Sequence, residues 1–95
     1  MTTATFYIGA DNVTRHVETV KALETVGNAF DGFAFWQATG YWKGEREETL
    51  VVQIAGLDEE GVELARALAR NLAEVLHQDA VALTLADESF ELIKA

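Results

Sequence analysis

The segment from Gly32 to Ile54 constrains the fold more than any other part of this 95-residue chain. It contains both tryptophans and further aromatic and β-branched residues, which are enriched in strands because they pack well on a pleated surface. Lys43-Gly44-Glu45 interrupts the apolar pattern, and Gly44 can adopt the positive φ angle that a tight turn requires. The segment therefore predicts a β-hairpin whose strands cover 33–40 and 49–54.

A helical pattern precedes this hairpin. Apolar residues recur at helical spacing from Val13 to Val26, and Asn12 or Thr14 is placed to cap the helix by accepting a bond from a free backbone N–H. Gly27-Asn28 provides a left-handed stop. The sequence thus predicts a first helix between the opening strand and the hairpin.

A second helix is expected after the hairpin. Asp58 is a good cap, and apolar residues continue at helical spacing to Leu76, where His77-Gln78-Asp79 ends the pattern. Alternating residues over 2–9 predict a first strand, and 80–85 predicts a last one.

The order strand, helix, strand, strand, helix, strand is that of a split βαβ unit. It predicts a ferredoxin-like α+β sandwich, in which a four-stranded antiparallel sheet carries two helices on one face. A short apolar tail or strand follows at the C-terminus. Ninety-five residues are enough for one modest core, so we expect a single domain over 1–95.

Charge and composition narrow the classes of partner. Sixteen acidic residues against seven basic ones give a net charge of −9, which repels nucleic-acid phosphates and suits either a basic partner or simple solubility. Cysteine is absent, which fits a reducing cytoplasm. No apolar run approaches the roughly 20 residues of a membrane span, and no secretion signal pattern is present. We expect a cytoplasmic protein without cofactor or metal.

The open sheet face predicts self-association. Because the hairpin carries aromatic residues in both registers, one set must lie on the face that the helices leave uncovered. Such apolar patches usually mark interfaces. We therefore expect a homo-oligomer, most simply a two-fold dimer, with Tyr7, Phe35, Phe90 and Leu92 at the interface. In the alternative, the tail folds back over its own sheet.

The hairpin turn is the best candidate for a ligand site. Tyr41, Trp42, Lys43 and Arg46 lie close to the turn, and Trp36 lies in the strand before it. Rings beside cations suit planar anionic ligands such as nucleotides, through stacking and charge neutralisation. In the alternative, these aromatic residues only pack against the rest of the domain.

A second group of candidate ligand-binding residues follows the first strand. Asp11, Asn12 and Thr14 stand next to a predicted helix N-terminus, where anions or hydroxyl groups can bind.

No catalytic residues are predicted. His16 and His77 stand at helix ends, where structural roles are the commoner ones. The acids around Glu47 flank a hairpin turn, where charge usually serves solvation or protects a sheet edge. The single serine, Ser89, lies in the tail and supports no nucleophilic triad.

The chain resembles small uncharacterised single-domain proteins of bacteriophages and bacteria. The resemblance is carried by the segments Ile8–Thr14, Gly40–Gly44, Glu48–Leu50 and Gln78–Val81. It implies a phage-type accessory protein that acts in the host cytoplasm and counters host defence. No catalytic or binding residue is implied by it.

Three functions remain open from the sequence. The first is a non-enzymatic, oligomeric binding module that sequesters a nucleotide-like signal at the hairpin turn. The second is an acidic inhibitor that docks on a basic host protein in the manner of a nucleic-acid mimic. The third is a small dimeric enzyme of ferredoxin-like fold.

Overall fold

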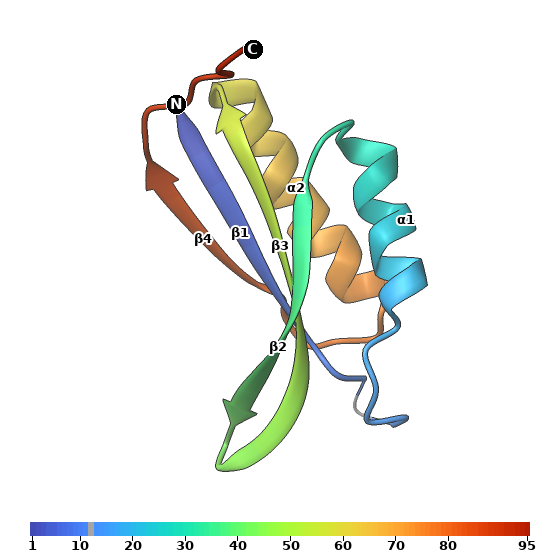
Figure 1. Ribbon diagram of the computed structural model, residues 1–95. Helices are drawn as coiled ribbons and strands as arrows, with labels where there is room; N and C mark the ends of the chain where they lie inside the picture. Colours follow the sequence, from blue (N-terminus) through green and yellow to red (C-terminus); the bar gives the residue numbers. More distant parts are fainter. Residues whose placement is uncertain (12) are drawn as a thin grey trace.

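Six elements form the fold in the computed structural model, which describes residues 1–11 and 13–95. They are β1 (Thr2–Gly9), α1 (Thr19–Ala29), β2 (Ala34–Trp42), β3 (Glu45–Leu57), α2 (Glu59–Val75) and β4 (Ala82–Asp87). The strands form one sheet in the order β2-β3-β1-β4, with every neighbouring pair antiparallel. Both helices lie on the same face of the sheet (Figure 1). The predicted ferredoxin-like architecture is confirmed.

The hairpin of β2 and β3 is longer than the sequence pattern predicted. Its two turn residues, Lys43 and Gly44, have φ angles of 51° and 80°. Positive φ at both central residues defines the type I′ turn, whose twist matches that of the flanking strands. Pairing therefore continues to Trp42 and Glu45, the last pair before the turn. The end of the hairpin projects beyond the helices as a two-stranded arm (Figure 1).

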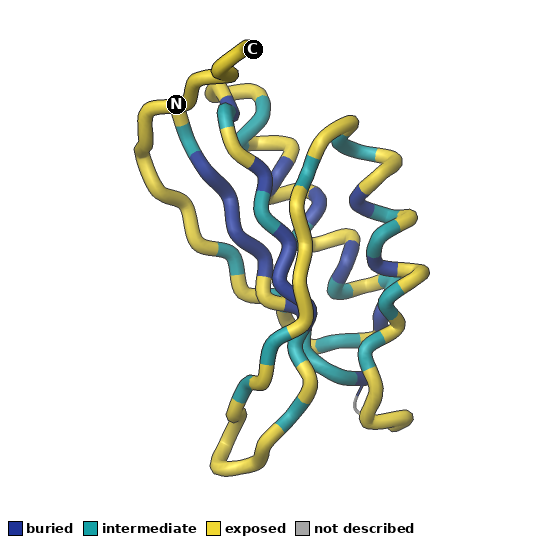
Figure 2. Tube along the Cα trace, viewed as in Figure 1, coloured by how far each residue is buried: buried dark blue, intermediate teal, exposed yellow. Residues whose placement is uncertain are grey.

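The core lies between the sheet and the two helices. Phe6 and Ile8 of β1 are fully buried and share this face with Leu50 and Val52, their partners on β3. The helices contribute the buried residues Ala22, Val26, Ala65, Leu68 and Leu72. Figure 2 shows the buried residues concentrated in β1, β3 and the inner sides of the helices, with β4 largely exposed. Within the described residues, neither helix combines the length and apolarity that crossing a bilayer requires.

Helix α1 begins later than predicted, at Thr19 instead of near Val13. The Asp11 carboxylate accepts hydrogen bonds from the backbone N–H groups of Val13 (2.7 Å) and Thr14 (2.9 Å). Such side-chain bonds offer the backbone an alternative to the helix, so the helical spacing of Val13 does not decide its conformation. Val13 is 88% exposed. The expected stop at Gly27-Asn28 was also wrong, because α1 runs to Ala29.

The Asp11 turn predicts a loss of stability in acid. The backbone bonds from Thr14 and Val13 hold the pKa of the Asp11 carboxyl below its usual value. A lowered native pKa stabilises the fold above the unfolded value of about 4, and that contribution disappears as the pH falls through the native pKa. The stability lost in Asp11→Ala should therefore be constant from pH 5 to 8 and shrink below about pH 4, as measured by urea unfolding.

Asp11→Asn is the matched control for this prediction. Its amide oxygen can still accept both backbone bonds, but it does not titrate in this range. Equal acid sensitivity of the Asp11→Asn variant and the unmodified chain would contradict the assignment.

Helix α2 begins and ends as its sequence predicted. The Asp58 side chain accepts a hydrogen bond from the Gly61 N–H at 2.8 Å, and Glu59 and Glu60 occupy the first turn. At the other end His77 adopts a left-handed φ of 53°, and the Gln78 N–H donates to the carbonyl of Ala73 at 2.8 Å. This is a Schellman closure of the helix. It fixes where Gln78 leaves the helix, and β4 begins four residues later, at Ala82 and not at Ala80.

The C-terminal tail packs on its own chain through Phe90. A register shift between Thr2 and Ala4 leaves an extra residue in β3, where Gly56 has a φ of 74°. A Cβ atom at Gly56 would lie 2.6 Å from the Phe90 ring. Gly56→Ala therefore meets both backbone strain and a clash, whereas the same change in a Phe90→Ala background meets only the strain, about 1–2 kcal/mol.

The double-mutant cycle tests this packing. We expect Gly56→Ala to cost clearly more in the unmodified chain than in Phe90→Ala, as measured by thermal and urea unfolding. Equal costs in the two backgrounds would place Phe90 away from Gly56.

Candidate ligand pocket

A row of side chains crosses the sheet face that lies away from the helices. Tyr7 pairs with Val51 on one side and Ala82 on the other, and Val51 pairs in turn with Trp36. Directly paired residues share a face, and Tyr7 follows the core residue Phe6, so this row lies on the opposite, open face. Val51 is only 4% exposed although it lies outside the main core. Its neighbours in the row therefore cover it.

A cavity of about 510 Å³ lies next to this row, between the hairpin arm and the segment that enters β4. Its lining comes from Tyr7, Gly9 and Ala10, from 38–43 on β2 and the turn, from Glu47, Thr49 and Val51 on β3, and from 78–82. Ligand pockets of this size hold drug-sized molecules.

Two glycines, which have no side chains, leave space in the pocket for neighbouring side chains of β3. A Cβ atom at Gly9 would lie 2.8 Å from the Oε1 atom of Glu47, and one at Gly40 would lie 2.5 Å from the Oγ1 atom of Thr49. The Glu47 carboxylate therefore occupies the space that a side chain at position 9 would fill. It lines the pocket, partly buried beside Gly9, instead of extending from the sheet edge into solvent.

Gln78 ties one wall of the pocket to Gly9. Its Nε2 atom donates a short hydrogen bond to the carbonyl oxygen of Gly9. Two pocket-lining side chains thus meet at Gly9: Gln78 bonds its carbonyl, and Glu47 lies where a Cβ atom would be.

The charges lining the pocket are mixed, with acids in excess. Glu47 and Asp79 supply two carboxylates, and Lys43 is the one basic side chain among the described lining residues. The Lys43 ammonium lies 5.9 Å from the centroid of the Trp42 ring, so Lys43 itself covers one face of this ring and leaves the two carboxylates as the charges open to a ligand. The pocket therefore suits a neutral or cationic planar molecule better than a polyphosphate.

The structure brings together only part of the predicted ligand site. Tyr41, Trp42 and Lys43 line the pocket, but Tyr41 pairs with Arg46, so strand alternation turns its ring to the helix side. Trp36 lies outside the lining, in the row beyond Val51. Arg46 lines a separate depression of about 460 Å³, together with residues of the helix side of the hairpin and of the start of α1.

The predicted site after the first strand is not part of the pocket. Asp11 uses its carboxylate to close its own turn, and the Thr14 hydroxyl bonds the backbone of His16. Neither residue is among the described residues lining the pocket. Asn12 lies outside the described residues.

Sequence reasoning missed three pocket residues. Glu47 was interpreted as a solvated charge beside a turn, and its position over Gly9 depends on the register of β1 against β3. Gln78 and Asp79 were interpreted as the end of a helix. The only sequence signal for them was the segment Gln78–Val81, one of those that carry the resemblance to phage proteins.

The predicted interface residues do not share one face. Phe35 pairs with the core residue Val52 and so lies on the helix side, half exposed at the sheet edge, while Tyr7 lies on the open side. Phe90 packs on Gly56, and Leu92 is 77% exposed.

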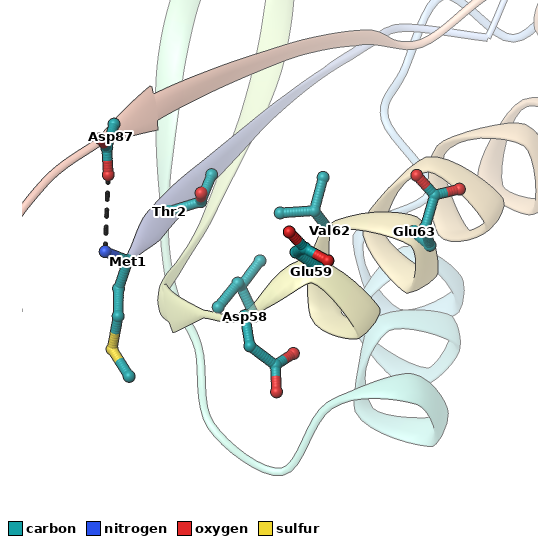
Figure 3. Close-up of a pocket in the computed structure, with 8 residues that line it drawn as sticks. Met1, Thr2, Asp58, Glu59, Val62, Glu63 and Asp87 are labelled. Carbon is teal, nitrogen blue, oxygen red and sulfur yellow. Dashed lines mark hydrogen bonds and ion pairs between the residues drawn. The ribbon is translucent and has the colours of Figure 1, made fainter.

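A third hollow lies beside Met1, between the start of α2 and the end of β4 (Figure 3). Its polar lining is acidic, with Asp58, Glu59, Glu63 and Asp87, and the N-terminal ammonium lies 3.4 Å from Asp87. Among the described residues, no three histidine, aspartate or glutamate side chains are grouped closely enough to hold a metal ion.

Comparison with known proteins finds similarity in fold. No family model matches the chain, and no curated protein sequence does. A phage SAM lyase in the apo state is 19% identical, with a TM-score of 0.62 over 90% of this chain and 78% of that one. A phage SAM lyase in complex with S-methyl-5′-thioadenosine is 17% identical, with a TM-score of 0.61 over 90% of this chain and 80% of that one.

Two further solved structures share the architecture. A DUF3240-family protein from Shewanella baltica is 12% identical, with a TM-score of 0.67 over 99% of this chain and 97% of that one. The periplasmic divalent cation tolerance protein CutA from Archaeoglobus fulgidus is 12% identical, with a TM-score of 0.51 over 95% and 87%. These likenesses establish that the chain has the ferredoxin-like fold of the phage SAM lyase and of CutA.

Proposed function

We propose that the open-face pocket binds an adenine nucleoside that carries a sulfur group at its 5′ carbon, as in S-adenosylmethionine and S-methyl-5′-thioadenosine. The observation that carries this proposal is the pocket itself, in which the open-face rings of Tyr7 and Trp42 lie near the Glu47 carboxylate. The phage SAM lyase, solved in complex with S-methyl-5′-thioadenosine, has the same fold and supports this ligand class.

The charge of the pocket favours such a ligand over a phosphorylated nucleotide. A sulfonium ion is attracted both by the face of an aromatic ring and by a carboxylate, and Trp42 and Glu47 offer one of each. Glu47 and Asp79 would repel the phosphates of ATP, and Lys43 alone does not offset them. The nucleotide-like signal expected from the sequence is thereby narrowed to a nucleoside without phosphate.

The biological role that follows is sequestration by a phage-type accessory protein in the host cytoplasm. A protein that holds S-adenosylmethionine without transforming it lowers the supply available to host enzymes that use it. Such an action would counter any defence that depends on this molecule.

The proposal includes assembly into a homo-oligomer. Tyr41 and Trp42, at the end of the projecting arm, are 73% and 67% exposed. An isolated two-stranded ribbon is only marginally stable in water, so an arm with exposed rings gains stability by packing against a second copy. Sedimentation equilibrium should give a mass of two or more chains, and a single chain at high concentration would contradict this part of the proposal.

Calorimetric titration tests the ligand class. S-methyl-5′-thioadenosine and S-adenosylmethionine should bind, and ATP, cyclic AMP and ADP-ribose should bind at least about tenfold more weakly, equivalent to 1.4 kcal/mol. Absence of heat with both sulfur compounds, or tighter binding of ATP, would contradict the proposal.

A second candidate function is cleavage of S-adenosylmethionine, favoured by the Glu47 carboxylate in the pocket and by the fold of the lyase. S-methyl-5′-thioadenosine retains the sulfur, its methyl group and the 5′ carbon, so its release breaks the bond between sulfur and the γ carbon of the amino-acid chain, and the electron pair goes to sulfur. The step balances if an oxygen of the substrate's own carboxylate bonds to that γ carbon and closes a lactone. Chromatography after incubation with S-adenosylmethionine separates the two functions. Intact S-adenosylmethionine supports sequestration, and stoichiometric excess of S-methyl-5′-thioadenosine over protein establishes the enzyme.

A further inference from the structure

The Gln78 carboxamide is held in a defined orientation at the edge of the pocket. The left-handed His77 and the Schellman closure of α2 fix the backbone at this point. The side-chain Nε2 atom then donates to the Gly9 carbonyl. A carbonyl oxygen accepts bonds but donates none, so the nitrogen and not the oxygen of the amide must face Gly9.

This bond leaves half of the amide unused. Nε2 carries a second hydrogen, and Oε1 has two lone pairs. Among the described residues, the bond to Gly9 is the one hydrogen bond that this side chain makes. Because Gln78 also lines the pocket, a donor and an acceptor remain side by side for a ligand.

We propose that Gln78 reads the base of the bound nucleoside and selects adenine. The proposal rests on the proposed function. A glutamine amide pairs with adenine in two bonds, with its oxygen accepting from the N6 amino group and its nitrogen donating to N7. Tyr7, half exposed in the pocket lining, presents a ring on which the base stacks. Trp42 and Glu47 are then left for the 5′ sulfur group.

The pairing predicts discrimination against the 6-oxo purines. Hypoxanthine and guanine carry an oxygen at C6, which would face the Oε1 atom of Gln78 with an acceptor opposite an acceptor. A matched two-bond pair discriminates by about 10- to 100-fold against the wrong base. The bond to Gly9 strengthens this selection, because an amide fixed in this way cannot turn over to present its nitrogen to the oxygen.

The test compares S-methyl-5′-thioadenosine with 5′-methylthioinosine by calorimetry, in the unmodified protein and in Gln78→Met. Methionine keeps the length of the side chain and removes both hydrogen-bonding groups. We expect the unmodified protein to prefer the adenine compound by at least tenfold and Gln78→Met to bind both compounds weakly and equally. Trp36→Ala, on the same face but outside the pocket lining, should keep the preference.

The ratio of the two affinities separates base reading from a merely structural role. If Gln78 only held the wall in place, Gln78→Met would weaken both compounds by the same factor and leave their ratio unchanged, which would overturn the proposal. If the unmodified protein bound both compounds equally, the proposal that Gln78 selects adenine would be overturned, but the proposed ligand class would stand. Binding of neither would overturn the proposed function as well.

Discussion

Phe6→Ala is expected to lower the free energy of unfolding by about 3–5 kcal/mol, a large part of the 5–15 kcal/mol typical of a small domain. Phe6 is fully buried and is among the largest side chains in the core. Its removal costs both the transfer of the ring from water and a cavity, because β1 is held between β3 and β4 and cannot close the gap. Urea unfolding followed by circular dichroism measures the effect.

Tyr7→Ala is the matched control, because Tyr7 is the next residue along β1 and faces the other way. It is partly exposed, so its loss should cost less than half as much stability as that of Phe6. It should, however, weaken S-methyl-5′-thioadenosine binding, which Phe6 does not contact. A larger loss of stability for Tyr7→Ala than for Phe6→Ala would reverse the assignment of the two sheet faces.

Trp42→Ala is expected to weaken binding of S-methyl-5′-thioadenosine by about 2- to 10-fold, the equivalent of the 0.3–1.5 kcal/mol that a contact between sulfur and an aromatic ring contributes. Trp42 lines the pocket at the end of the arm, where its side chain is not part of the core. Its removal should therefore leave the unfolding midpoint almost unchanged at concentrations where the protein is monomeric, because the proposed packing of the arm on a second copy does not contribute there. Calorimetry and thermal unfolding of the same sample give both quantities.

Trp36→Ala tests whether the ligand binds in the pocket or over the whole open face. Both tryptophans belong to β2 and lie on the open face, but Trp36 pairs with Val51 in the row beyond the pocket. Its removal should uncover Val51 and reduce stability, with little effect on the affinity for S-methyl-5′-thioadenosine. If the two variants bind equally weakly, the ligand lies over the whole face and not in the pocket.

Much of this fold could be predicted because its local signals agree with its packing. The hairpin followed from Gly44 and its aromatic flanks, and the start of α2 from Asp58, since each of these residues acts through its near neighbours. The start of α1 could not be predicted in this way. There the Asp11 carboxylate competes for the same backbone that the apolar spacing assigned to a helix.

The pocket was predicted less completely because its members meet only through the sheet. Trp42 and Lys43 were found as an aromatic residue beside a cation along the chain. Glu47 and Gln78 converge on Gly9 through the pairing of β1 with β3 and the closure of α2, over sequence separations that carry no local pattern. Arg46 was assigned to the same site by proximity in sequence, and strand alternation turns it to the other side of the hairpin.

The crowding around Gly9 limits how this protein can evolve. Acids exposed on the helices can drift with little effect on fitness, but any heavier residue at position 9 would displace Glu47 and disturb the carbonyl to which Gln78 is anchored. A lineage that changed its ligand would have to do so by exchanging the rings and the amide around this glycine while retaining the glycine itself.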